Sequence, residues 1–367
     1  MNSRNKISFP LAAAILFFAI SFAPAAPPRQ TTISIDGQSF LINNKPTYAG
    51  RTYNGMKIEG LLLNARLVQA TFDDRNPQTR HLWKYPDGQN FDADRNTAEF
   101  LAALPLYRKA GLISFTINLQ GGSPQGYSKE QPWHNSALES DGSLRADYLQ
   151  RLEKILDRAD ELGMAPILGL FYFGQQYRLP NDEAVQKATD NATDWLLSKG
   201  YTNLLIEIAN ETNHSSYTSP LLKPANAHEL IQRVQQRSGR KFLVSTSFTG
   251  GQIPSDNVAQ HADFLLLHGN GIGDPNRIRK MVDQTRALKS YHNQPILFNE
   301  DDHFDFAKPD NNFLAALSKG AGWGYFDFRK EGEPFDEGFQ SVPVNWQISS
   351  DRKRGFFQLL QQITGGN

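Results

Sequence analysis

Short apolar runs alternate with longer amphipathic stretches along most of the chain. Eight runs are predicted as strands, because they are apolar, rich in β-branched or aromatic residues and bounded by turn signals. They are YAGR near Tyr48, LISFTINL from Leu112, APILGLFYF from Ala165, TNLLIEIAN from Thr202, KFLVSTSF from Lys241, DFLLLHG from Asp263, QPILFNE from Gln294 and GWGYFDFR from Gly322. Between them, stretches such as LRADYLQRLEKILDRADEL, DEAVQKATDNATDWLLSK and ANAHELIQRVQQRSG repeat their apolar residues at helical spacing.

Eight strands, each followed by a helix, predict an α/β fold of the (β/α)₈ TIM barrel type. A chain of 367 residues has the length that this fold needs. The alternative is a doubly wound open sheet, which often carries a glycine-rich phosphate loop. Neither GxGxxG nor GxxxxGK[ST] follows the first predicted strand, so the pattern favours the barrel.

Two segments near the amino terminus depart from this alternation. Residues 31–47 predict a short β-hairpin, with apolar alternation around Asp36-Gly37 and a second turn at Asn43-Asn44. GLLLNARLVQATFDD, which begins at Gly60, predicts an extra helix or lid between the first two barrel strands, and HLWKYPDGQNFDADRN after it predicts a loop. No repeat or low-complexity linker divides residues 26–367, so we expect one catalytic domain that includes the hairpin.

Composition narrows the classes of function. Hydrophobic residues make up 39% of the chain and aromatic residues 11%, which is enough for a sizeable core. Lysine plus arginine and aspartate plus glutamate each number 38, so no net charge favours nucleic acid or an anionic membrane as a partner. The absence of cysteine excludes disulfides, thiolate metal sites and a cysteine nucleophile. We expect a monomer without a cofactor.

The first 25 residues resemble a secretory signal peptide. A basic start with Arg4 and Lys6 precedes an apolar stretch over 11–22, and the small residues of Ala23-Pro24-Ala25 follow. The apolar stretch is short for a membrane span of roughly 20 residues, although a retained anchor is the alternative. We therefore expect a mature chain that begins near Ala26 and is secreted or periplasmic, without stable membrane association.

Polar side chains follow several of the predicted strands. In a barrel, the carboxyl ends of the strands meet at one mouth, where catalytic residues lie. The polar ends are Asn118-Leu119-Gln120 on the second strand, Asn210-Glu211 on the fourth, His268-Gly269-Asn270 on the sixth and Asn299-Glu300-Asp301-Asp302-His303 on the seventh. On the eighth, Trp323, Tyr325, Asp327 and Arg329 alternate and so share one face. Amides, aromatics, a histidine and two glutamates at one mouth are typical of a site for a polyhydroxylated ligand.

Two carboxyl groups on different strands are what cleavage of a glycosidic bond requires. One must be protonated to give a proton to the leaving oxygen, and the other must be ionised to attack the anomeric carbon or to activate water. A separation of about 5–5.5 Å gives retention through a glycosyl-enzyme, whereas a wider gap leaves room for water and gives inversion. Asn210, beside Glu211, is placed to hold the sugar hydroxyl next to the reacting carbon.

The motifs on the fourth and seventh strands resemble those of clan A glycoside hydrolases, and most of all family 5. Glu207-Ile-Ala-Asn210-Glu211 is similar to that family's strand-four motif, and PILFNEDDH ends its strand in Glu300. The resemblance implies that Glu211 is the acid/base and Glu300 the nucleophile, and it places His268 and Trp323 in the sugar-binding cleft. Where the family often has His-x-Tyr on strand six, this chain has His268-Gly269-Asn270.

Several residues fit more than one role. His268 and Trp323 are either sugar contacts or core residues. Asp301 or Asp302 is the alternative to Glu300, and Glu207 is expected to form a buried ion pair with Arg51 or Arg66. Further sugar contacts are expected from residues at or near strand ends. These are Arg66, Gln120, Tyr172 and Tyr325.

We therefore predict a retaining glycoside hydrolase that acts on a β-linked oligo- or polysaccharide with two glutamates and no metal. The alternatives are a catalytically inactive carbohydrate-binding barrel and a metal-dependent hydrolase that uses the Asp301-Asp302-His303 segment. No HxH or HExxH motif supports the metal alternative, and no GxSxG elbow supports a serine hydrolase.

Overall fold

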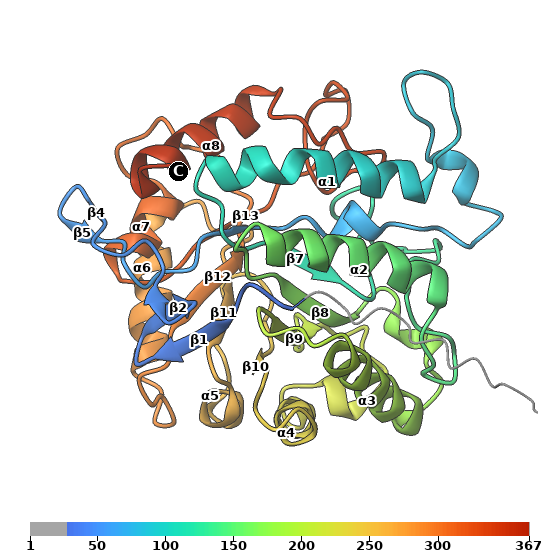
Figure 1. Ribbon diagram of the computed structural model, residues 1–367, viewed down its shortest axis with the longest axis horizontal. Helices are drawn as coiled ribbons and strands as arrows, with labels where there is room; N and C mark the ends of the chain where they lie inside the picture. Colours follow the sequence, from blue (N-terminus) through green and yellow to red (C-terminus); the bar gives the residue numbers. More distant parts are fainter. Residues whose placement is uncertain (1–27, 367) are drawn as a thin grey trace, which may run out of the picture.

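The computed structural model describes residues 28–366 and shows a (β/α)₈ barrel, with its helices arranged outside the strands (Figure 1). The predicted signal peptide lies outside the described residues. The barrel strands are β6 (Asn64–Ala65), β7 (Thr116–Asn118), β8 (Ile167–Tyr172), β9 (Leu205–Asn210), β10 (Leu243–Ser245), β11 (Leu265–His268), β12 (Ile296–Glu300) and β13 (Gly324–Tyr325). Across residues 28–366, no helix is both long and apolar enough to cross a bilayer.

Backbone pairing closes these strands into a ring. Strands β7, β8, β9 and β10 pair in parallel in that order, as do β11 with β12 and β13 with β6. Parallel bridges join β6 to β7 at Arg66 and Thr116, and β12 to β13 at Asp301 and Tyr325. The remaining junction, between β10 and β11, carries a hydrogen bond of 2.9 Å from the Asp263 amide to the Val244 carbonyl.

The outer layer consists of helices that bury one apolar face against the strands. They are α1 (Ala93–Lys109), α2 (Ala146–Glu161), α3 (Asp182–Ser198), α4 (Ala227–Arg237), α5 (Asp256–His261), α6 (Pro275–Arg286), α7 (Asn312–Ser318) and α8 (Asp351–Thr364). The first turn of α1 is capped by Asp92, whose carboxylate accepts from the amides of Asp94 and Arg95. The helical periodicity predicted for the segments that form α2, α3 and α4 is confirmed.

An antiparallel sheet precedes the barrel, as the alternation over 31–47 predicts. It consists of β1 (Ile33–Asp36), β2 (Ser39–Ile42) and β3 (Lys45–Pro46). Phe40 packs edge-on against Phe264, with ring centroids 6.0 Å apart, and joins an apolar cluster with Leu62, Leu205 and other inward residues. This sheet therefore closes the amino-terminal end of the barrel. A small hairpin of β4 (Thr52–Tyr53) and β5 (Met56–Lys57) follows it.

The first barrel strand is not where the sequence pattern placed it. Tyr48 lies in a turn with φ of +50°, whereas the strand β6 lies within the segment predicted as a helix or lid. Only a 3₁₀ turn, η1 (Val68–Thr71), follows β6 in that segment. A short apolar run that is buried on both faces carries no periodicity that separates a strand from a buried helix.

Inward-facing positions change from apolar to polar toward the mouth of the barrel. Residues two apart on a strand share a face, so Leu62, Asn64 and Arg66 rise in that order from the closed end. The same change from apolar to polar occurs along β9 between Leu205 and Glu207, and both residues are fully buried. The fold thus places its buried polar groups directly beneath the carboxyl ends of the strands, where a site is expected.

Candidate active site

A cleft of about 910 Å³ opens at the carboxyl ends of the strands. Its floor is formed by strand ends, and much of one wall is formed by a single stretch of the loop between β7 and α2. The lining residues are Arg66, Gly126, Tyr127, Ser128, Lys129, Glu130, Gln131, Pro132, Tyr172, Phe173, Gly174, Tyr177, Asn210, Glu211, His214, Ser216, Glu300, Phe326 and Gln340. A volume of this size is typical of a ligand site.

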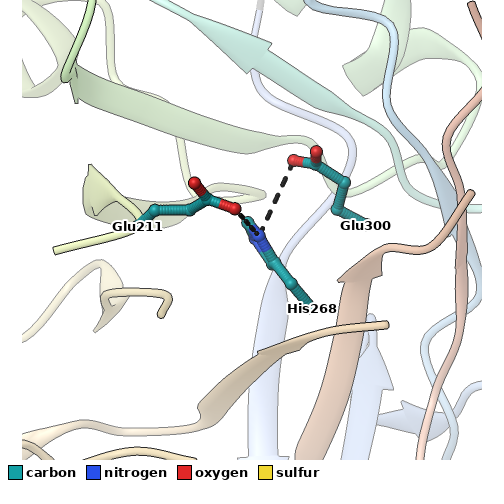
Figure 2. A group of neighbouring side chains, drawn as sticks. All are labelled: Glu211, His268 and Glu300. Atoms are coloured by element: carbon teal, nitrogen blue, oxygen red, sulfur yellow. Dashed lines mark hydrogen bonds and ion pairs between the residues drawn. The ribbon is translucent and has the colours of Figure 1, made fainter. Parts of the chain in front are cut away.

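Glu211 and Glu300 face each other across this cleft, with His268 between them (Figure 2). The Nδ1 atom of His268 lies 3.0 Å from Oε1 of Glu211 and 3.8 Å from Oε2 of Glu300. One carboxylate oxygen of each glutamate lies within 4.8 Å of the other. Two acids that are 89 positions apart in the chain (300 minus 211) therefore share one small space.

Glu211 adopts a backbone conformation that is unfavourable for a residue with a side chain. Its φ is +58°, in the left-handed region, where non-glycine residues are uncommon. The segment after β9 is held there by Ser247, which lies two residues after β10. Its hydroxyl accepts from the Glu211 amide at 2.9 Å and its carbonyl from the Thr212 amide at 2.8 Å. Strain that neighbouring contacts hold in place is common at functional sites.

Glu300 is buried and lies beside a cation and a hydrogen-bond donor. Arg66 places its NH1 atom 3.0 Å from Oε2, and the Asn270 amide donates to Oε1 at 2.7 Å. Burial opposes the charge of Arg66, but Glu300 and Glu207 outweigh it, so the pKa of Arg66 lies above its ordinary value. The ion pair and the amide hydrogen bond together fix the orientation of this carboxylate.

His268 and Glu211 are joined by a hydrogen bond that holds one proton between them. Burial disfavours a charged His268, but Glu300 and the hydrogen bond to Glu211 outweigh burial and raise the pKa of His268. Burial likewise disfavours a charged Glu211, yet the hydrogen bond and the charge of His268 lower the pKa of Glu211. Because the protonation of each group changes the charge that the other one meets, they gain and lose that proton as a pair.

Solved structures share the fold that carries these residues. No protein-family model matches the sequence, and no curated protein is similar to it. A glycoside hydrolase family 5 structure from Bacteroides vulgatus is similar with a TM-score of 0.55 and 12% identity, over 90% of this chain and 70% of that one. The fold is that of family 5 glycoside hydrolases.

Two further structures agree with that match. A broad-specificity endoglucanase from Bacteroides salanitronis has a TM-score of 0.52 and 12% identity, over 83% of this chain and 92% of its own. A family 5 mannosidase from Rhizomucor miehei has a TM-score of 0.52 and 13% identity, over 91% and 97% of the two chains. The resemblance that the strand-end motifs predicted is therefore confirmed for the fold, in a divergent chain.

Glu207, on β9 beneath the cleft, does not form the expected ion pair. Arg51 lies elsewhere and donates to the carbonyl groups of Gln362 and Ile363, while Arg66 pairs with Glu300. Instead Glu207 is fully buried, and the side-chain amide of Asn299 points to its Oε2 at 3.4 Å. Burial raises the pKa of Glu207, against the charges of His268 and Arg66 and a hydrogen bond from Ser247. Burial therefore favours the protonated form of this carboxyl group.

The raised pKa of Glu207 distinguishes two substitutions at this position. Glu207→Gln keeps the size of the side chain and replaces the carboxyl group by an uncharged amide, so activity within about twofold of wild type and an unchanged melting temperature are expected. Glu207→Ala leaves a cavity and unsatisfied neighbours, which costs about 2–4 kcal/mol of unfolding free energy. Thermal unfolding and steady-state rates of both variants check this. A large loss of activity in a well-folded Glu207→Gln would show that the site needs a charged Glu207.

Three predicted sugar contacts do not reach the cleft. Trp323 is fully buried, stacks on Phe313 at 4.6 Å and donates its Nε1 proton to Asp301. Tyr325 is also buried and donates its hydroxyl proton to Asp327 at 2.7 Å. The alternation along the strand shows that Trp323 and Tyr325 share a face, but it does not show which face points into the barrel. In the structure their shared face points toward the helices. Gln120 is buried as well, with Oε1 accepting from the Tyr172 amide.

The remaining predicted residues lie at the site in different ways. Asn210 and Arg66 line the cleft, and so does Tyr172, whose pKa burial raises to about 12. The Oδ1 atom of Asn210 is buried and has no hydrogen-bond partner among residues 28–366. His268 is fully buried behind the two glutamates, so it contacts them rather than open cleft.

Sequence reasoning missed several cleft residues. Phe326 lines the cleft from the face of the β13 segment opposite to Trp323 and Tyr325. It would have been predicted if the even-numbered positions of that run had been taken as the inward-facing ones. Phe173 stacks on His214 with ring centroids 3.8 Å apart, and both line the cleft. Tyr127 enters from the loop between β7 and α2, and no motif signals it.

The Asp301-Asp302-His303 segment has its polar atoms engaged with one another. Nδ1 of His303 lies 3.1 Å from both Asp301 Oδ1 and Asp302 Oδ1, and these contacts raise the pKa of His303 to about 10. Asp301 also accepts from Trp323 and Asn312. Asp301 therefore has a structural role beside the cleft. Of the acids Glu300, Asp301 and Asp302, it is Glu300 that lines the cleft.

Proposed function

We propose that this protein is a retaining glycoside hydrolase that cleaves β-linked bonds of an oligo- or polysaccharide. Glu211 is the acid/base and Glu300 the nucleophile. The observation that carries the proposal is the approach of their carboxylate oxygens to within 4.8 Å. That spacing fits direct attack on a sugar carbon, which uses carboxyl groups about 5–5.5 Å apart, and not an intervening water molecule.

The reaction proceeds in two displacements. An oxygen of Glu300 attacks the anomeric carbon while Glu211 donates its proton to the glycosidic oxygen, so the leaving sugar departs as an alcohol. Glu211 then removes a proton from water, whose oxygen attacks the same carbon and releases Glu300 as a carboxylate. Two inversions at one carbon return the original configuration.

The surroundings of each glutamate suit its role. Arg66 and Asn270 orient the Glu300 carboxylate for attack and stabilise it as the leaving group of the second step. The hydrogen bond between His268 and Glu211 stores the proton that the first step consumes. Asn210, with a free acceptor atom in the cleft wall, is suited to a hydroxyl of the bound sugar.

The shared proton gives an expected pH dependence. The pKa of His268 is raised, so the pair keeps its proton above the ordinary histidine value of about 6.5 and loses it as the pH rises through that raised value. In His268→Ala, Glu211 holds the proton alone, and we expect the basic limb of kcat/KM to move down by at least about one pH unit. Profiles over about pH 4–9 measure this, with exposed His292→Gln as the control. An unmoved basic limb contradicts the shared-proton account.

The proposal is tested by a screen of aryl β-glycosides and polysaccharides for released reducing ends, with and without a chelator. We expect turnover on at least one β-linked substrate, unchanged by the chelator. Binding without turnover by the wild-type protein favours a carbohydrate-binding barrel. Activity that the chelator removes and a divalent cation restores favours a metal-dependent hydrolase.

A further inference from the structure

Tyr127 is an exposed aromatic residue whose hydroxyl group is nevertheless fixed. Its relative exposure is 59%, and its ring meets Phe326 and Phe328 edge-on at the cleft wall. The hydroxyl donates to Oδ2 of Asp302 at 2.9 Å and accepts from the side-chain amide of Asn270 at 2.7 Å. A tyrosine hydroxyl that is open to water needs neither hydrogen bond, so these two contacts are expected to hold another group in place.

Asn270 links this hydroxyl to the candidate nucleophile. Its Nδ2 atom has two hydrogens, of which one points to Oε1 of Glu300 at 2.7 Å and the other to the Tyr127 oxygen at 2.7 Å. Its Oδ1 atom has no partner among the described residues. The orientation of the amide is therefore set by Glu300 and Tyr127 alone, and the carboxylate requires the nitrogen on its side.

The chain of contacts has one direction. Asp302 is an acceptor, and its pKa is low because hydrogen bonds from His303, the Gly271 amide and Tyr127 outweigh burial. The Tyr127 proton therefore goes to Asp302, which leaves the tyrosine oxygen free to accept from Asn270. The second amide hydrogen is then directed at Glu300. Removal of the Tyr127 hydroxyl would release one of the two contacts that hold this amide.

The loop that carries Tyr127 is shaped to bring it there. The residue before it, Gly126, has φ of +79°, and a Cβ atom at that position would lie 2.4 Å from the ring of Phe328. Only glycine fits such a close approach without displacement of the ring. Tyr127 thus reaches across the mouth from the loop after β7 to the residues that follow β11 and β12.

We propose that Asn270 is a positioning residue for Glu300 and that Tyr127 acts through it. This inference rests on the proposed function, because it assigns Glu300 as the nucleophile. Asn270 fixes the carboxylate in the attacking orientation, and the loop that carries Tyr127 is thereby connected to the reacting group. Sequence position gives no hint of this link, since Tyr127 and Asn270 lie 143 residues apart.

A double-mutant cycle tests this link. A hydrogen bond to a charged group implies that Asn270→Ala lowers kcat/KM by about ten- to a hundredfold, mostly through kcat. Tyr127→Phe keeps the ring in the cleft and should lower it by about three- to tenfold. If Tyr127 acts through Asn270, the double variant is no worse than Asn270→Ala alone. Tyr53→Phe, on the hairpin of β4 and β5, is the matched control.

The division of the loss between kcat and KM distinguishes positioning from a structural role. Asn270 contacts Glu300, so Asn270→Ala should lower kcat and leave KM within about twofold of wild type, with a smaller fall in kcat in Tyr127→Phe. A rise in KM at unchanged kcat would contradict the positioning role.

The outcomes separate this inference from the proposed function. Active wild type, inactive Glu300 variants and normal Asn270→Ala and Tyr127→Phe kinetics would overturn the inference and leave the function intact. Additive losses in the double variant would overturn the action of Tyr127 through Asn270. Inactive wild type on every substrate would instead remove the proposed function. Equal melting temperatures across the variants show that the comparison concerns the site and not the fold.

Discussion

Glu300→Ala is expected to lose at least about ten-thousandfold in kcat, because the carboxylate that forms the glycosyl-enzyme is gone. The substitution leaves Arg66 and Asn270 facing a small space in the cleft floor. A small anion such as azide fits such a space and is attracted by the guanidinium group. We therefore expect azide to restore turnover of an activated aryl β-glycoside and to give an α-glycosyl azide, the product of a single inversion.

The matched control for this variant is Asp302→Asn, two residues further along the chain. Asp302 lies beside the cleft and reaches Glu300 only through Tyr127 and Asn270. A moderate loss that azide does not change is expected for it. Similar large losses in both variants, or azide rescue of Asp302→Asn instead of Glu300→Ala, would transfer the nucleophile role to Asp302.

Glu211→Ala is expected to show a dependence on the leaving group that Glu300→Ala does not. Loss of a general acid costs about 10²–10⁴-fold where the leaving oxygen needs a proton, and much less where the leaving group is a stable phenolate. The first step on an activated aryl glycoside should therefore remain fast. The second step, which needs a base for water, becomes slow, and a burst of phenolate should appear before the steady state.

Azide also distinguishes the two glutamates. In Glu211→Ala the nucleophile is intact, so azide attacks the glycosyl-enzyme from the face that water uses and gives a β-glycosyl azide. Proton NMR of the product measures the anomeric configuration of the glycosyl azide. An α-azide from Glu211→Ala, or equal losses for good and poor leaving groups, would contradict the acid/base role of this residue.

Most barrel strands were predictable because each is a long apolar run that ends in polar residues. The runs that form β8, β9 and β12 are buried along their whole length, and their last residues are the ones that face the cleft. The rule that catalytic groups lie at the carboxyl ends then brings Glu211 and Glu300 together without coordinates. The run that contains β6 failed, because its burial on both faces hides the period that separates a strand from a helix.

The parts of the site that could not be predicted depend on contacts between distant segments. The alternation of positions around β13 correctly puts Trp323 and Tyr325 on the same face. Whether that face points into the barrel depends on how α7 and α8 pack against the strand. The link from Tyr127 to Asn270 depends on the path of one loop across the mouth. Local pattern contains no information on such a path, since any of the aromatic residues in the loops has the same sequence signal.

The central claim is that Glu300 forms a covalent bond to the sugar. A 2-deoxy-2-fluoro β-glycoside of the sugar found in the screen slows the second step and lets the glycosyl-enzyme accumulate. Peptide mass spectrometry of the trapped wild-type protein should show one added sugar, on the peptide PILFNEDDH at Glu300. A protein that turns over the parent glycoside with inversion and forms no adduct, or that carries the sugar on another residue, would contradict the account.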